Sequence, residues 1–307
     1  MKLGFLIVVS ILLSCQNQEK HVKDNVNKKT DSIKLDETEI TEQDTIHKSI
    51  SQKINSAITQ KKVFGKDILD DFQMNGDKRE TKINDSLFVK FLENFNAYQN
   101  NENDLLYKNS KYETWNTLAY STDNSISKEA LNFQDSVKKI GFLVGTNEGD
   151  IYLKKDPNFL NKFKPFLSKR MNKFIDQYNI EINIPFLSDA SIMISNTEHI
   201  RRIIFWEKFA KNHKYFELPS YAESQYINYL SSFMLGTDNS PICDWSDSNK
   251  IYVGVIDSYK DVISEYPNSK SAKYLMEYLE YLEQKNFKYD SSLKVDLKEK
   301  FPEVFGN

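Results

Sequence analysis

The sequence has few of the residues that metal and redox sites need. Only two of its 307 residues are cysteine and only four are histidine. There is no CxxC, no HExxH and no cluster of histidines at ligand spacing, which excludes the common zinc motifs. The G-x-S-x-G motif of serine hydrolases is also missing, and Gly145 and Gly149 lack the lysine of a phosphate-binding loop. We therefore expect no cofactor, no metal and no recognisable catalytic motif.

Strong positive charge and long apolar runs are missing too. The net charge is −3, and the densest basic spots, Lys169-Arg170 and Arg201-Arg202, are only two residues wide. Nucleic-acid binding needs a broader basic surface, so we expect no nucleic-acid partner. The apolar run from Leu3 to Leu13 has eleven residues, whereas a membrane-spanning helix needs about 20. Behind Lys2, this run fits a secretory signal peptide.

A short motif closes this run at Leu12-Leu13-Ser14-Cys15. It resembles the lipobox of bacterial lipoprotein precursors. The resemblance implies that residues 1–14 are a signal peptide that is removed, and that the Cys15 thiol is acylated, for example with palmitate, which attaches the protein to a membrane. Gln16 is not the aspartate that retains many such proteins at the inner membrane, so the resemblance favours the outer membrane, facing the periplasm or the outside. An ordinary signal peptide with an incidental cysteine is the alternative.

The segment after the lipobox is polar. Residues 16–62 contain no aromatic residue, no glycine and no proline. Such a segment buries too little apolar surface to offset its ordering entropy, so residues 15–62 are predicted to be a lipidated cysteine and a disordered tether. Basic and acidic residues nearly balance, which excludes a polybasic lipid-binding patch. The isoleucines at positions 46, 50, 54 and 58 lie on one helical face. They predict a short amphipathic helix that leads into the domain; a partner-binding helix or a short coiled coil is the alternative.

The composition changes after residue 62. All the aromatic residues except Phe5 lie between Phe64 and Phe305, so residues 63–307 are predicted to form a globular part of one domain or two small ones. Helical periodicity dominates this part. Helices are expected from Asn84 or Asp85 to Tyr98, Asp156 to Tyr178, Asn196 to Phe209, Ser220 to Leu235, Asn249 to Tyr266, Ser269 to Gln284 and Leu293 to Phe301.

Strand signals are sparse. Phe142 to Val144 and Ile151 to Leu153, on either side of a turn, predict one β-hairpin. The pieces Ile180 to Ile184 and Ile192 to Ile194 are predicted to be strands or extended loops. Pro165, inside the second expected helix, should kink or split it. The predicted fold is mainly α, with a small β-hairpin element.

Two looser resemblances concern the folded part. The pair of helices from Asn249 to Gln284, with Tyr266-Pro267-Asn268-Ser269 between them, resembles a tetratricopeptide helix pair, without a second copy. The lipobox, the tether and three short segments together resemble an uncharacterised lipoprotein family of Gram-negative bacteria; the segments are Trp206-Glu207, Asp238-Asn239-Ser240-Pro241 and Tyr266-Pro267-Asn268-Ser269. That resemblance implies no activity.

Few residues are candidates for chemistry. Once Cys15 is lipidated, Cys243 has no disulfide partner in the chain, and we interpret it as a small buried residue. His199 is the only histidine that we pair with it as a hypothetical catalytic couple. The acids Asp238, Asp244 and Asp247 share one loop, which lacks the spacing of a calcium-binding EF-hand.

We expect the helical domain to act by binding in the cell envelope. The first candidates for a contact surface are the tyrosines of the carboxy-terminal helix pair, because tyrosine is favoured at interfaces: Tyr252, Tyr259, Tyr274, Tyr278 and Tyr281. Core packing is the alternative for each. Two other functions stay open. One is an envelope hydrolase acting on glycan or peptide, which needs a concave pocket where several acids or His199 converge; the pairs Glu148 with Asp150 and Glu198 with Glu207 could supply acid and base. The other is an immunity-type lipoprotein that binds one protein partner through a flat aromatic patch.

Overall fold

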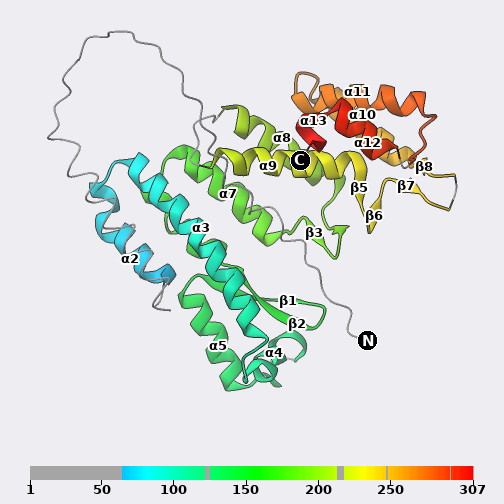
Figure 1. The fold of residues 1–307 in the computed structure, drawn as a ribbon. Coiled ribbons are helices and arrows are strands. Elements are labelled where there is room, and N and C mark those ends of the chain that lie inside the picture. Colours follow the sequence, from blue (N-terminus) through cyan, green and yellow to red (C-terminus); the bar gives the residue numbers. More distant parts are fainter. Residues whose placement is uncertain (1–63, 122–124, 213–217, 247, 291, 307) are drawn as a thin grey trace, which may run out of the picture. The chain divides into compact units, whose positions relative to one another are not determined.

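The computed structural model describes residues 64–121, 125–212, 218–246, 248–290 and 292–306, which are coloured in Figure 1. Within these ranges the chain is mainly helical, with short antiparallel strand pairs. The predicted fold class is therefore confirmed. The expected signal peptide, Cys15, the tether and its isoleucine helix lie outside the described residues.

The helices follow one another along almost the whole described chain (Figure 1). They are α2 (Phe64–Asn75), α3 (Thr81–Leu106), α4 (Tyr112–Tyr120), α5 (Lys128–Lys139), α6 (Pro157–Asn161), α7 (Lys169–Asn183), α8 (Asn196–Asn212), α9 (Pro219–Leu235), α10 (Val253–Glu265), α11 (Lys270–Gln284), α12 (Leu293–Lys300) and α13 (Pro302–Phe305), with 3₁₀ turns η1 (Gly76–Lys78) and η3 (Lys164–Phe166). The strand pairs are β1 (Phe142–Asn147) with β2 (Asp150–Lys155), β3 (Leu187–Ser188) with β4 (Ser191–Ile192), β5 (Gly236–Thr237) with β6 (Ser240–Pro241), and β7 (Cys243–Asp244) with β8 (Lys250–Ile251).

The aromatic stripe of α3 forms the centre of the first part of the core. Phe91 stacks on Phe95 and on Phe163, with ring centroids 4.9 and 5.0 Å apart. Phe95 also stacks on Phe142 of β1 at 4.3 Å. All four rings are fully buried. Buried aromatic pairs are worth about 0.5–1.5 kcal/mol beyond their area, so this stack fixes the hairpin and the chain around Phe163 against α3.

The expected start of α3 is wrong by about one turn. The helix begins at Thr81, and Asn84 and Asp85 are buried inside it. The Asn84 amide donates to the carbonyls of Gly76 and Phe166, both at 2.9 Å. Asp85 Oδ1 accepts from the backbone N–H of Ser168 at 2.9 Å. These polar side chains serve distant backbone groups instead of capping their own helix.

Proline splits the predicted helix from Asp156 to Tyr178. Helix α6 ends at Asn161, η3 contains Pro165, and α7 begins at Lys169, with the Ser168 hydroxyl accepting from Met171 N–H at 3.1 Å. The expected strand or loop at Ile180 to Ile184 is wrong, because α7 continues to Asn183. The side chain of Gln177 bonds that of Glu181 one turn later at 2.5 Å, which extends the helical pattern through this stretch.

The predicted hairpin is present, and its strands β1 and β2 are longer than expected. The outer edge of β2 is covered by polar side chains of the preceding helices. Asn103 Oδ1 accepts from Leu153 N–H at 2.7 Å, while Gln99 donates to the Leu153 carbonyl at 2.8 Å. Asn116 of α4 accepts from Ile151 N–H at 2.9 Å. A two-stranded sheet is marginal alone, and these bonds pair its open edge.

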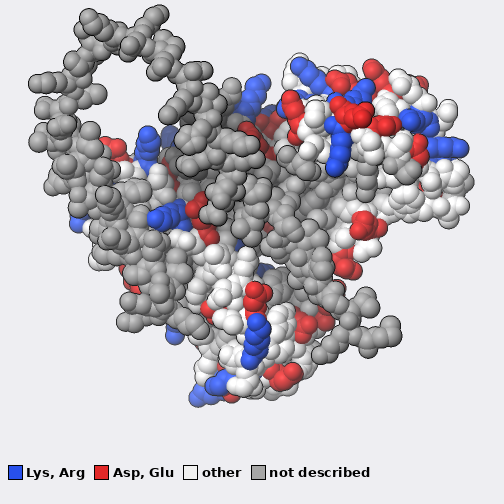
Figure 2. Space-filling view, in the orientation of Figure 1, with Lys and Arg blue, Asp and Glu red and all other residues white. Residues whose placement is uncertain are grey.

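The carboxy-terminal helices follow the predicted order. Helix α9 ends at Leu235 with Gly236 in the cap position, and α11 begins after Ser269, whose hydroxyl accepts from Ala272 N–H at 2.9 Å. Helix α10 starts at Val253 rather than Asn249, because Lys250 and Ile251 pair with β7. On the face shown in Figure 2, acidic and basic side chains are intermixed over these last helices. Among the described residues, none of the helices is both long and apolar enough to cross a membrane.

Candidate binding site

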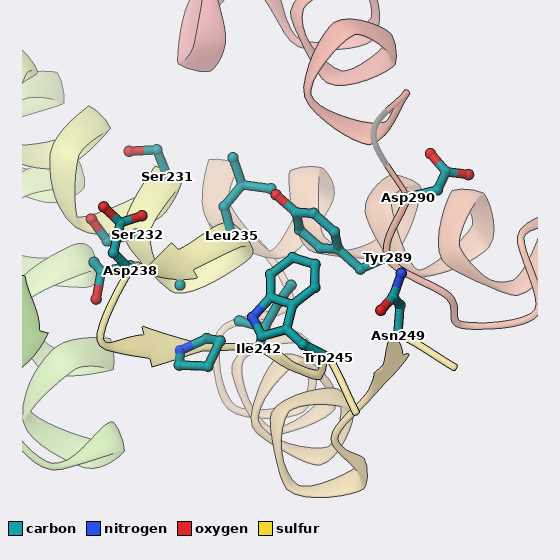
Figure 3. A pocket seen from close by; sticks show the side chains of 12 residues that line it. Ser231, Ser232, Leu235, Asp238, Ile242, Trp245, Asn249, Tyr289 and Asp290 are labelled. Carbon is teal, nitrogen blue, oxygen red and sulfur yellow. The ribbon is translucent and has the colours of Figure 1, made fainter. Parts of the chain in front are cut away.

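A depression lies where the end of α9, the two short strand pairs that follow it and the chain after α11 meet. Its volume is about 910 Å³. Figure 3 shows the side chains that surround it. They are Ser231, Ser232, Leu235, Gly236, Thr237, Asp238, Pro241, Ile242, Trp245, Asn249, Tyr289 and Asp290.

Gly236 makes the sharp turn that brings these elements together. Its φ of +67° and ψ of −163° fall in a region that is essentially restricted to glycine. A Cβ atom at this position would also collide with the carbonyl oxygen of Ser240. The chain therefore passes directly from α9 into β5, and β6 pairs with β5 in the antiparallel direction. Ile242 and Trp245, which follow β6, then line the depression.

Two aromatic rings form the middle of the depression (Figure 3). Trp245 is 59% exposed, whereas Tyr289 is only 9% exposed. Their centroids are 5.0 Å apart and their planes meet at 77°. The backbone N–H of Tyr289 donates to the Asn249 carbonyl at 2.8 Å, which fixes the base of the pair. A large exposed tryptophan held by a buried ring is a preformed contact surface.

The hydroxyl group of Tyr289 is available to a ligand. It points toward Leu235 in Figure 3 and bonds to none of the described residues. Burial raises the pKa of this hydroxyl, with smaller contributions from Cys243 and Asp238. It therefore stays protonated at neutral pH, and it is close enough to the Asp238 carboxylate to interact with it electrostatically.

Two carboxylates lie on opposite sides of the aromatic pair. Asp238 follows β5, and Asp290 follows Tyr289 (Figure 3). One oxygen of Asp290 accepts from the hydroxyl and N–H of Ser292 and from Leu293 N–H. These bonds, the Ser292 hydroxyl first, lower the pKa of Asp290. Among the described residues that line the depression, none is lysine, arginine or histidine.

The lining hydroxyls mostly donate away from the depression. The Ser232 hydroxyl donates to the Asn228 carbonyl at 2.7 Å, and that of Ser231 donates to the same oxygen at 3.2 Å. The Thr237 hydroxyl donates to the Ala190 carbonyl at 2.5 Å. Since each donor is used, these oxygens present lone pairs to whatever enters.

The tyrosine prediction needs correction at two positions. Tyr259 and Tyr278 are 0% exposed, so they are wrong as members of a contact surface. Their hydroxyls both donate to the Met234 carbonyl, at 2.9 and 3.0 Å. They satisfy a carbonyl in the last turn of α9, which lacks a helical partner, and so support the helix end that borders the depression.

The other three tyrosines do not gather on one patch. Tyr252 is 44% exposed. Tyr274 is partly buried and donates to Glu303, whereas Tyr281 is partly buried and donates to Asp296. These two hydroxyls tie α11 to the last two helices. The aromatic residues at the depression, Trp245 and Tyr289, were not among the predicted contact residues.

The couple of Cys243 and His199 does not form a catalytic site. Cys243 is a buried free cysteine, as its interpretation as a small core residue predicts, and burial raises the pKa of its thiol. His199 is also buried, and burial lowers its pKa to about 4. Its Nε2–H donates to the Tyr229 carbonyl at 2.9 Å. A neutral imidazole and a protonated thiol lack the activation that nucleophilic catalysis needs.

The predicted acid pairs are used elsewhere. Glu198 binds Arg201 and Arg202 at 2.6 and 2.7 Å, and the Arg201 hydrogen bonds are the largest cause that lowers the pKa of Glu198 to about 2. Glu207 accepts from the first N–H groups of α11. Asp150 accepts from the Tyr112 hydroxyl at 2.7 Å. Within the described residues, no group of three or more His, Cys, Asp or Glu side chains is arranged to hold a metal ion.

A buried polar cluster joins α7, α8 and α9 away from the depression. Arg202 is fully buried and donates to Glu198, to the Tyr229 hydroxyl at 3.1 Å and to the Ile184 carbonyl at 2.8 Å. Glu181 accepts from the indole of Trp206 at 2.7 Å, and burial raises the pKa of this carboxyl group. These bonds link three helices, so we assign the cluster a structural role.

Comparisons with known proteins give no relative: no family model matches the chain, and no curated protein or solved structure is significantly similar to it.

Proposed function

We propose that this chain is an exported lipoprotein, attached to a membrane of the cell envelope through Cys15, whose helical domain binds a small ligand. The first fourteen residues are the signal peptide in this proposal, and residues 15–62 are the tether. The resemblance of Leu12-Leu13-Ser14-Cys15 to a lipobox supports the attachment. Two or more acyl chains hold a protein on a bilayer stably, whereas one binds reversibly.

The depression around Trp245 carries the binding part of the proposal. Its volume of about 910 Å³ is in the range of sites for small ligands. Trp245 keeps 59% of its surface exposed although the domain has a large apolar core that buries most other aromatic rings. Tyr289 and the hydrogen-bonded end of α9 hold this surface in place. Preorganisation of this kind lowers the entropic cost of binding.

The alternative functions find less support. A hydrolase with two acids needs one of them protonated to supply a proton. The pKa of Asp290 is lowered, so Asp290 suits the role of the base and not that of the proton donor, and no observation assigns the proton donor to another group of the depression. An immunity-type protein predicts a flat aromatic patch, but Tyr259 and Tyr278 are buried.

Attachment is tested by fractionation of Gram-negative cells that express the full chain. We expect wild-type protein in the membrane fraction and Cys15→Ser in the soluble fraction. Cys243→Ala is the matched control, because it removes the buried thiol and leaves Cys15 in place. Equal amounts of wild type and Cys15→Ser in the membrane fraction would contradict the attachment.

A further inference from the structure

The depression between α9 and the chain after α11 has a chemistry that points to one class of ligand. Resting on the proposed binding function, we propose that it binds a linear organic dication, in which two ammonium groups are joined by an alkyl chain. The argument uses the charge of the lining, its hydrogen-bonding capacity and the arrangement of its aromatic rings.

The charge of the lining favours a cation. Asp238 and Asp290 are its ionisable acids, and the described lining residues include no basic side chain. Lys285 is the basic side chain that helps to lower the pKa of Asp290, but its ammonium group is 3.4 Å from Asp296. An anionic ligand would meet two carboxylates without a compensating charge, whereas a dication would neutralise both.

The hydrogen-bonding capacity of the lining is compatible with an ammonium group. An ammonium group has three donors and no acceptor. The hydroxyls of Ser231, Ser232 and Thr237 donate to backbone carbonyls, so their oxygens accept. The Tyr289 hydroxyl oxygen bonds to none of the described residues and accepts as well. Trp245, Asn249 and Tyr289 also carry donors, so it is the charge of the lining, and not its hydrogen bonding alone, that favours a dication over a neutral sugar.

The aromatic pair suits the alkyl part of the ligand. Trp245 and Tyr289 stand between the two carboxylates in Figure 3. An alkyl chain that crosses the exposed Trp245 ring removes apolar surface of both from water, which favours binding. In the proposal, one ammonium group pairs with Asp238 and the other with Asp290, on either side of the rings. One ligand therefore satisfies the rings and both acids together.

The test is isothermal titration calorimetry of the full-length protein in detergent. The probes are 1,5-diaminopentane and the longer triamine spermidine, with pentylamine and 1,5-pentanediol as matched ligands that lack one or both charges. We expect a diamine or triamine to bind about tenfold more tightly than the monoamine, because one ion pair is lost in the monoamine. The diol should not bind detectably.

Variants link the binding to the depression. Asp238→Asn and Asp290→Asn should each weaken diamine binding about tenfold and leave monoamine binding less affected. Trp245→Ala should weaken all the amines. Asp257→Asn is the control, because this exposed acid of α10 lies outside the lining. Circular dichroism of each variant checks that it is folded.

Four outcomes would overturn the proposal. Diol binding equal to diamine binding removes the role of charge, and diamine binding that is unchanged in Trp245→Ala places the ligand elsewhere. If maltotriose, a neutral sugar, binds through Trp245 while the amines do not, the dication is wrong but the proposed binding function stands. If none of these probes binds, the dication is wrong, whereas the attachment through Cys15 is judged by fractionation alone.

Discussion

The buried imidazole of His199 predicts how the stability of the domain depends on pH. Its ring contacts Phe186 and Phe233 edge to face, with centroids 4.8 and 5.1 Å away, and its Nε2–H donates to the Tyr229 carbonyl. Burial, which is the largest cause, and the nearby charge of Arg202 lower its pKa from 6.5 to about 4. The folded protein therefore holds this imidazole neutral, whereas the unfolded chain protonates it near pH 6.5.

The sign and size of the effect follow from proton linkage. Between about pH 4 and pH 6.5 the unfolded state binds more protons at His199 than the folded state does. The full free energy of unfolding is therefore present above pH 6.5, and part of it is lost as the pH falls toward 4. The difference between 6.5 and about 4 corresponds to about 3 kcal/mol at most, and about 2 kcal/mol of it is lost between pH 7 and pH 5.

The assay is urea unfolding of wild type and His199→Gln at several pH values between 7 and 5. Glutamine keeps an amide donor for the Tyr229 carbonyl but does not titrate. The free energy of unfolding of the wild type should fall by about 2 kcal/mol more than that of the variant over this range. Parallel pH profiles for the two proteins would refute the assignment of a buried neutral imidazole.

Three further substitutions test how the core and the depression are held, each by chemical denaturation. Trp206→Phe should lower the free energy of unfolding by about 2–3 kcal/mol, since it leaves the Glu181 carboxyl without its indole donor. Phe205→Leu, a change at the partly buried neighbouring residue, should lower it by less. Gly236→Ala should lower the free energy of unfolding by about 1–3 kcal/mol because of the positive φ of Gly236. Gly254→Ala, where a Cβ has open space, should leave the free energy of unfolding unchanged or raise it. Asn84→Ala should lower the free energy of unfolding by about 1–3 kcal/mol, because the Gly76 and Phe166 carbonyls lose the bonds of this buried amide. A loss below about 0.5 kcal/mol, roughly that of an exposed change, would contradict this role.

Local signals predicted much of the fold. Gly236 ends α9, Ser269 caps α11, and Pro165 interrupts the helix that its surroundings favour. Each of these effects is exerted on the next few residues, so the sequence alone reveals it. Asn84 and Asp85 look like caps for the same local reason, but they bind Phe166 and Ser168, about 80 residues away. Contacts of that range leave no periodic signal.

The depression was harder to predict than the helices. Its lining comes from α9, two short loops and the segment after α11, and only the folded chain brings Trp245 beside Tyr289. Most of the predicted tyrosines lie on helices with clear periodicity. The same periodicity is equally consistent with Tyr259 and Tyr278 as core residues, which they are. A tryptophan beside aspartate in a loop, as at Asp244-Trp245, was the available signal for the site.

The most direct test of the central claim is mass spectrometry of the first peptide of the mature protein, purified from membranes. The account predicts a peptide that begins at Cys15 and carries acyl chains on its sulfur. A peptide that retains residues 1–14, or that begins at Cys15 with an unmodified thiol, would contradict the claim that this helical domain works from a lipid anchor.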